Sequence, residues 1–549
     1  MRKFIQTTKD GDAMSASLSA KLLSTALLSL CLSTTMLANA NAGERESLEQ
    51  LRATTVNLVK LLVQEGVLSK DKAEALLKQA EKDAEKAKQL DATVTAQNKD
   101  AIDTKADEKM VRVQYVPEHI KNEMREEIEM KVMSKLHYKA EERLGIPDWI
   151  DRLHWEGDLR LRYQGDRFGD GNPVALNFNA NNQTDIKNTT EDRDRARVRA
   201  RLGVKAEVND WMKAGIRITT GDLTDPISPN QTQETASAKY TIGLDRAYVT
   251  AQIKPWLSIT GGRFENPWFS TDLVWDPDLA FDGIAASFTS GIYENLSSFV
   301  TVGAFPIDEI EKSAVNKAQS KWLYGGQAGV KWIAPNKSTV KLGVALYEFD
   351  NIEGQQNGAV FNPGPYDATA PTYHTKGNSL FDINSGSGTP VYALASQFRE
   401  LNLTGEVDVA SFDPVHVILT GDYVRNIGYD KSEIAERTGL ISALLPKEDV
   451  DAYQLKLAVG MPDMKKGKDW QAYIAYKYLG ADSVLDGFTD SDFYLGGTNA
   501  KGWVLGGSYG LDKNAWITAR WFSAEEIAPR GSLEPLSIDV LMLDLNTKF

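Results

Sequence analysis

Cysteine is nearly absent from this chain of 549 residues, which contains one, and histidine occurs only five times. The single cysteine, Cys31, lies in an N-terminal apolar run that we expect to be removed. Its removal leaves no thiol for a disulfide, a thiolate metal site or haem attachment. Histidine is too scarce for an acid–base site, and the sequence has no phosphate-cradling glycine loop or His/Cys metal spacing. We therefore expect no enzyme activity, no catalytic residues, no metal and no cofactor.

An excess of positive charge is also missing, because the formal net charge is −14. This charge disfavours nucleic acid as a partner. The mean hydropathy of −0.35 is too polar for a helical membrane protein. After residue 43 no stretch has the roughly eighteen consecutive apolar residues that a membrane helix needs.

The only long apolar run extends from Leu22 to Leu37 and follows Lys21. It is followed by small and polar residues, Ala38 to Ala42, which complete the pattern of a secretory leader with its cleavage site. We predict a signal peptide over residues 1–42 and a mature chain that begins near Gly43. Export without a second apolar span leaves the periplasm, the outer membrane or the medium as the destination.

Residues 43–150 have the pattern of a helical region rich in charge. A short heptad run begins it, with Leu48, Leu51, Thr55, Leu58 and Leu62 in steps of three and four. Such a stripe packs on a neighbouring helix, joins protomers as a short coiled coil or serves as a docking surface. The sequence leaves these alternatives open, and a homo-oligomer is one of them.

The stretch from Arg193 to Thr220 alternates between apolar and charged side chains. Its charged positions include Arg195, Arg197 and Arg199, and its apolar positions are mostly alanine and valine. In a β-strand the two kinds point to opposite faces, whereas a helix would spread the apolar residues around its circumference. A wet interior and a lipid-facing exterior explain both faces, although an exposed antiparallel sheet has the same pattern.

About sixteen such strands are expected between residue 154 and the C-terminus, the sixth and seventh at 281–288 and 297–305. Tight turns alternate with long loops, which is typical of outer-membrane barrels. We predict an all-β transmembrane barrel of about 16 antiparallel strands over residues 151–549. Its location is the outer membrane of a Gram-negative type of cell, in contact with lipid. The short turns and the helical region 43–150 are expected in the periplasm.

The last strand places Leu541, Leu543, Leu545, Thr547 and Phe549 on one face, and the chain stops at the aromatic residue. This ending resembles the C-terminal signal read by the barrel assembly machinery. We therefore expect that machinery to be a partner of the chain.

Five segments together carry a family resemblance. They are NLVKLLVQEGVLSKDKAEALLKQAE (57–81), YVPE (115–118), PDW (147–149), WEGDLRLRY (155–163) and GGRFENPWFSTDLVWDPDLAFDG (261–283). In this order they resemble the bacterial outer-membrane putative porin family, from about residue 48 to Phe549. The resemblance implies an outer-membrane β-barrel with an N-terminal helical region, and it implies no catalytic or ligand residues.

A barrel of this size encloses water, so we predict a channel for small hydrophilic solutes. The arginines expected to line it, and to favour anions, are Arg160, Arg162, Arg195, Arg197, Arg199, Arg201 and Arg217. An alternative is that these side chains brace the wall by pairing with Glu156, Asp158, Asp194 and Glu207. Two other functions stay open, an envelope tether or adhesin without significant transport and a membrane-embedded hydrolase, but no triad supports the second.

The connection from Glu265 to Ala280 mixes aromatic and acidic side chains, a composition that suits a solvated loop poorly. We predict that it folds inward and narrows the pore opposite the arginines. Its candidate constriction residues are Glu265, Trp268, Asp272, Asp276 and Asp278. An external cap, with the aromatic residues packed on neighbouring loops, is the alternative.

Overall fold

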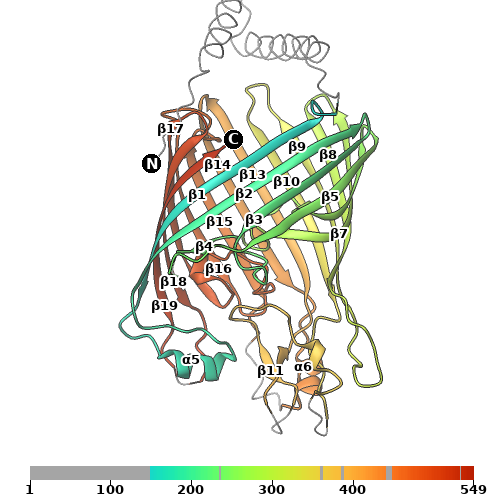
Figure 1. Cartoon of the computed structure of the whole chain (residues 1–549), viewed down its shortest axis with the longest axis vertical. Helices are drawn as coiled ribbons and strands as arrows, with labels where there is room; N and C mark the ends of the chain where they lie inside the picture. Colours follow the sequence, from blue (N-terminus) through green and yellow to red (C-terminus); the bar gives the residue numbers. More distant parts are fainter. Residues whose placement is uncertain (1–148, 234–235, 359–362, 385–388, 441–447, 532) are drawn as a thin grey trace, which may run out of the picture. The chain divides into compact units, whose positions relative to one another are not determined.

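The computed structural model describes residues 149–233, 236–358, 363–384, 389–440, 448–531 and 533–549. The predicted signal peptide and all but the last two residues of the predicted helical region lie outside these ranges. Within them, the chain forms a large antiparallel sheet that closes into a barrel (Figure 1). The predicted class, an all-β barrel of sixteen strands, is confirmed.

Sixteen long strands form the barrel wall. They are β1 (Leu153–Phe168), β2 (Arg193–Asn209), β3 (Met212–Thr220), β5 (Ile242–Lys254), β6 (Leu257–Glu265), β7 (Ala280–Tyr293), β8 (Leu296–Asp308), β9 (Lys321–Ile333), β10 (Thr339–Asp350), β13 (Arg399–Phe412), β14 (Val415–Asn426), β15 (Asp451–Gly460), β16 (Trp470–Leu479), β17 (Ala500–Asp512), β18 (Ala515–Glu526) and β19 (Ser537–Lys548). The ring closes because β1 pairs with both β2 and β19. Closure removes free sheet edges, whose backbone groups would find no hydrogen-bond partner in lipid.

Successive side chains of each strand point alternately outward and inward. On β1, Leu159 and Leu161 are 38% and 44% exposed, whereas Arg162 and Gln164 are 2% and 1% exposed. Because the side-chain period of a strand is two, one register fixes the face of every residue on it. The apolar faces therefore point to lipid, and Arg160 and Arg162 of β1 and the arginines of β2 point into the lumen.

Connections at one end of the barrel are short and those at the other end are long. The short ones include Asp210–Trp211, Pro255–Trp256 and Lys513–Asn514, while the long ones reach 48 residues over 351–398. One short turn differs from the prediction, because β7 continues to Tyr293 and the turn to β8 is only Glu294–Asn295. Figure 1 shows the C-terminus at the short-turn end and α5, β11 and α6 at the other.

Smaller elements belong to the long loops. They are α5 (Ala175–Asn182), β4 (Gln231–Thr232), η1 (Asp367–Thr369), β11 (Leu380–Asp382), β12 (Tyr392–Leu394), α6 (Lys431–Thr438) and η3 (Phe493–Leu495). Helix α6 begins after Asp430, whose carboxylate accepts hydrogen bonds from the backbone N–H groups of Ser432 and Glu433, and it ends at Gly439. In the part of the chain that the structure describes, no helix is long and apolar enough to cross a membrane.

The lumen contains a packed apolar core as well as charged side chains. Trp275, from the connection between β6 and β7, packs edge-on against Tyr347 and Phe281, with ring centroids 5.1 Å apart in both pairs. Trp268 of the same connection lies 5.3 Å from Tyr347. The inner faces of β7 to β10 thus carry apolar residues that the long loops cover, which is a drier interior than the sequence pattern indicated.

Phe549 occupies the seam where the barrel closes. Its backbone N–H donates to Gly157 at 3.0 Å and its carbonyl accepts from Gly157 at 2.9 Å, while its side chain is 67% exposed. We predict that deletion of Phe549 lowers the amount of heat-modifiable folded barrel in membranes severalfold, because the closing pair and the terminal aromatic are lost together. Electrophoresis without heating measures this. Wild-type folding of the truncated chain would show that the terminal aromatic is incidental to assembly.

Candidate functional site in the barrel lumen

The seven predicted arginines lie along the inner faces of β1, β2 and β3, and we call them the arginine strip. Arg160 lies directly opposite Arg199, and Arg162 lies opposite Arg197. Like charges that face each other across two strands destabilise a sheet. The strip therefore requires acidic partners.

Asp158 and Asp278 supply part of that compensation. Asp158 of β1 accepts hydrogen bonds from Arg199 at 2.9 Å and Arg201 at 2.7 Å. Asp278, from the connection between β6 and β7, bonds the same two arginines at 3.1 and 2.9 Å. Arg160 lies 4.0 Å from Asp278. One carboxylate from the wall and one from a loop thus serve three guanidinium groups.

Arg162 belongs to a buried group of two arginines and two aspartates. It bonds Asp544 of β19 at 2.7 Å and Asp492, from the connection between β16 and β17, at 2.9 Å. Arg520 of β18 bonds the same two carboxylates at 3.1 and 2.9 Å. Burial alone would raise the pKa of Asp492, but the charges of Arg162 and Arg520 hold that pKa below its usual range. The group ties a loop to the wall.

The bracing partners considered from the sequence are mostly different ones. Among the described residues, Asp158 is the one of those four that pairs with the strip, and Arg195 and Arg217 pair instead with Asp166 and Asp245. The other three have other partners: Glu156 pairs with Lys205, Asp194 with Arg167 and Glu207 with Lys213. Asp194 cannot reach the strip because it lies on the outward face of β2, between inward-facing neighbours.

Arg197 differs from its neighbours in its partners. Its guanidinium donates to the side chains of Gln164 at 3.1 Å and Ser228 at 3.3 Å, and to the carbonyl of Asn230 at 3.3 Å. In the described ranges these partners are all neutral. Arg197 therefore keeps a positive charge in the lumen that no hydrogen-bonded carboxylate cancels.

Loop 266–279 reaches from β6 and β7 to strands nearly half-way round the ring. Asp272 bonds Lys477 of β16 at 2.9 Å, and the Thr271 hydroxyl donates to Asp422 of β14 at 2.6 Å. Asp278 meets the arginine strip on β2, as described above. Because these contacts lie on different parts of the wall, the loop extends across the lumen.

Four of the five predicted constriction residues belong to loop 266–279, and one belongs to the wall. Glu265 ends β6 and pairs with Arg246 of β5 at 2.5 Å, so it belongs to the wall rather than to the loop. Trp268 packs on the wall. Asp278 contacts the strip directly instead of facing it across the lumen. Burial raises the pKa of Asp276 well above its usual value, as do the charges of Asp278 and Asp490.

Loop 480–499, between β16 and β17, also lies inside the barrel, and the sequence reasoning missed it. Asp482, Thr489 and Phe493 are at most 1% exposed. The Thr489 hydroxyl donates to the carbonyl of Leu273 at 2.8 Å, which joins this loop to loop 266–279. Its mixture of carboxylates and aromatic residues resembles that of loop 266–279. This composition is the sequence feature from which its position inside the barrel could have been predicted.

Loop 351–398 is joined to loop 480–499 by a buried lysine. The ammonium group of Lys376 donates to the carbonyls of Tyr494 at 2.7 Å and Gly496 at 2.6 Å. Asn378 adds bonds to the carbonyls of Ala481 at 2.7 Å and Val484 at 2.9 Å. Burial lowers the pKa of Lys376 to about 7. Three loops are therefore connected inside or above the lumen.

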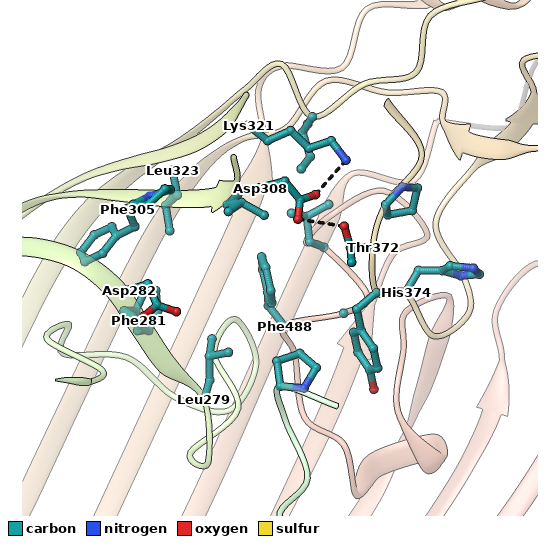
Figure 2. A pocket seen from close by; sticks show the side chains of 18 of the residues that line it. Leu279, Phe281, Asp282, Phe305, Asp308, Lys321, Leu323, Thr372, His374 and Phe488 are labelled. Atoms are coloured by element: carbon teal, nitrogen blue, oxygen red, sulfur yellow. Dashed lines mark hydrogen bonds and ion pairs between the residues drawn. The ribbon is translucent and has the colours of Figure 1, made fainter. Parts of the chain in front are cut away.

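Two cavities between these loops and the wall adjoin the residues described above. The first, of about 310 Å³, is lined largely by aromatic and aliphatic side chains, and we call it the aromatic chamber. Figure 2 shows Phe281 and Phe305 on one side of it and His374 on the other, with Phe488 between them. The second, of about 360 Å³, adjoins the arginine strip, and we call it the basic chamber. Asp225 and Tyr373 line both, so the two chambers are neighbours.

Comparisons with known proteins give one family and several solved structures. A profile of the family described as "Putative porin" matches residues 52–549. A high-pH structure of Pseudomonas putida OprB matches with a TM-score of 0.43 and 11% identity, over 73% of this chain and 96% of that one. The Acinetobacter baumannii outer membrane channel DcaP matches with a TM-score of 0.37 and 10% identity, over 72% and 97%. No curated protein matches the chain.

Proposed function

The chain belongs to the family described as "Putative porin" and forms a porin-type channel, and we propose that small hydrophilic solutes diffuse through it with a preference for anions. The observation that carries this preference is the incomplete compensation of the arginine strip. Arg160, Arg199 and Arg201 share Asp158 and Asp278, and Arg197 bonds neutral groups. Two carboxylates therefore bond three of these four cations, and the charge of Arg197 has no hydrogen-bonded carboxylate among the described residues.

A positive excess acts strongly on solutes at this position. Arg195 and Arg197 of the strip line the basic chamber, and in such an enclosed space fixed charges attract counter-ions and exclude ions of the same sign. The acidic net charge of the whole chain does not oppose this, because charges beyond a Debye length, about 10 Å at 0.1 M salt, are screened. Local charge therefore decides the selectivity.

Reversal potentials in planar bilayers test the proposal. Across a KCl gradient near 0.1 M, the parent channel is expected to favour chloride. Replacing Arg197→Ala together with Arg199→Ala should shift the reversal potential toward potassium, and the shift should fade near 1 M salt, where the Debye length is about 3 Å. Arg425→Ala is the control, because Arg425 is exposed on the outer face and pairs with Asp451. Equal reversal potentials for the parent and the double variant would refute the anion preference.

The orientation in the outer membrane is a second part of the proposal. We propose that the short turns and the region 43–150, most of which lies outside the described residues, are periplasmic. Protease added to intact cells should cut within loop 351–398 and spare residues 43–150. Mass spectrometry of the fragments locates the cuts. Cleavage within 43–150 on intact cells would reverse the orientation.

A further inference from the structure

The basic chamber has the charge of an anion-binding site. Its lining includes four cationic side chains, Lys187, Arg193, Arg195 and Arg197, and two carboxylates, Asp166 and Asp225. These come from β1, β2 and the loops after β1 and β3, so distant parts of the chain supply them. Cations gathered around one cavity attract an anion into it.

Both carboxylates of the lining are engaged by groups of the protein. Asp166 accepts hydrogen bonds from Arg195 at 2.7 Å and Gln164 at 2.8 Å. Asp225 accepts from the hydroxyl of Tyr373 at 3.2 Å and from backbone N–H groups of its own turn. Within the described ranges, Arg197 donates its hydrogen bonds to the neutral oxygens of Gln164, Ser228 and Asn230, so its charge is available for a charged ligand.

The rest of the lining favours an organic anion over an inorganic one. Phe168, Ile186, Ile227 and Leu495 add apolar surface to the chamber. The volume of about 360 Å³ lies in the range of small-molecule sites, which combine apolar walls with a few placed polar groups. A small inorganic ion would leave this apolar surface in contact with water.

We propose that the basic chamber is a binding site for a small organic carboxylate, with its charged group at Arg197 and its apolar body against Phe168, Ile227 and Leu495. This inference rests on the proposed anion preference and names a solute class for it. Guanidinium groups suit a carboxylate because their parallel N–H groups match its two oxygens. The site lies on the long-loop side of the strip, where it would hold a solute before passage.

The test uses the full-length protein in detergent micelles and three probes. Benzoate carries the charge and the ring, benzamide has the same shape without the charge, and acetate has the charge without the ring. Binding is measured by calorimetry, after heat-modifiability has shown that each variant is folded. Benzoate should bind at least about tenfold more tightly than benzamide or acetate, as expected for one charge-assisted contact together with apolar burial.

Two variants and one control locate the site. Arg197→Gln should weaken benzoate binding about tenfold and leave weak benzamide binding unchanged. Ser228→Trp fills the chamber from the loop without removing a charge, and it should abolish the binding of both benzoate and benzamide. This variant replaces Arg197→Gln in the test if Arg197→Gln does not fold. Arg425→Gln should bind like the parent.

The possible results separate this inference from the proposed function. Equal affinity for benzoate and benzamide, or parental benzoate binding by both chamber variants, would overturn the site. Benzoate binding that depends on Arg197, together with a reversal potential that shows no anion preference, would uphold the site and refute only the selectivity. Anion preference without benzoate binding would refute the site and uphold the selectivity.

Discussion

Deletion of residues 268–276 is expected to raise the single-channel conductance severalfold, because it removes the segment that extends across the lumen. The same deletion also removes part of the support of loop 480–499, which keeps the bonds of Asp492 to Arg162 and Arg520. That loop is held by bonds from Thr489 to the carbonyl of Leu273, at 2.8 Å, and from the backbone N–H of Ser491 to Asp276, at 2.9 Å. Losing both contacts loosens loop 480–499 in addition to shortening loop 266–279. Single-channel recording in symmetric salt measures the change.

A deletion of equal length elsewhere is the matched control. Residues 309–317, in the connection between β8 and β9, are mostly exposed. Their removal shortens a long loop by nine residues and leaves loop 266–279 intact. Its conductance should equal that of the parent. If the deletion of 268–276 also conducts like the parent, loop 266–279 is not the constriction and the external cap becomes the better interpretation.

The barrel wall could be predicted from the sequence because its signal is local. The alternation in Arg193 to Thr220 fixes both the strand and its two faces, and turn residues such as Asn209 and Asp210 mark its end. The predicted strand ends were less accurate where neighbouring side chains differ little in polarity. The sixth strand was expected to end at residue 288, yet its pairing continues to Gly291 opposite Ser297 and beyond, because backbone hydrogen bonds do not need apolar side chains.

The site could be predicted only in part, for a related reason. The alternation of side chains along a strand is enough to place Arg160 and Arg199 on the inner face. Their partners depend on loop conformation, which has no periodic signal: Asp492 meets Arg162 across 330 residues of sequence. The inward course of loop 480–499 depends on such contacts as well. Asp278 was expected opposite the strip but lies on it, because a short loop that begins at β6 can fold back toward β2.

The second large effect is expected at Lys477, which connects both lumen loops to the wall. Its ammonium group lies 2.9 Å from Asp272 of loop 266–279 and 2.5 Å from Asp490 of loop 480–499, and the residue is 2% exposed. Replacement Lys477→Met keeps most of the side-chain volume and leaves the buried carboxylate of Asp490 close to the partly exposed one of Asp272 without their cation. Removing one partner of a buried ion pair costs about 3–5 kcal/mol.

That cost is large enough to release both loops from β16 while the barrel wall, held by its backbone hydrogen bonds, stays folded. We therefore expect Lys477→Met to raise conductance, with frequent transitions between levels as the loops move, and to expose loop 480–499 to protease. Lys501→Met is the control, since Lys501 pairs with Glu525 at the partly exposed outer surface. Exposed pairs contribute only about 0–1 kcal/mol, so this variant should behave like the parent.

A triple variant distinguishes charge from shape at this position. Adding Asp272→Asn and Asp490→Asn to Lys477→Met removes the two uncompensated carboxylates and keeps side chains of similar size. Because an isosteric neutral replacement of a whole buried ion group is often nearly neutral in stability, the triple variant should return toward parental conductance and protease resistance. If Lys477→Met instead conducts like the parent, the two loops are held by their packing alone. If the triple variant conducts like Lys477→Met, the loss of the lysine side chain itself, and not the unpaired carboxylates, releases them.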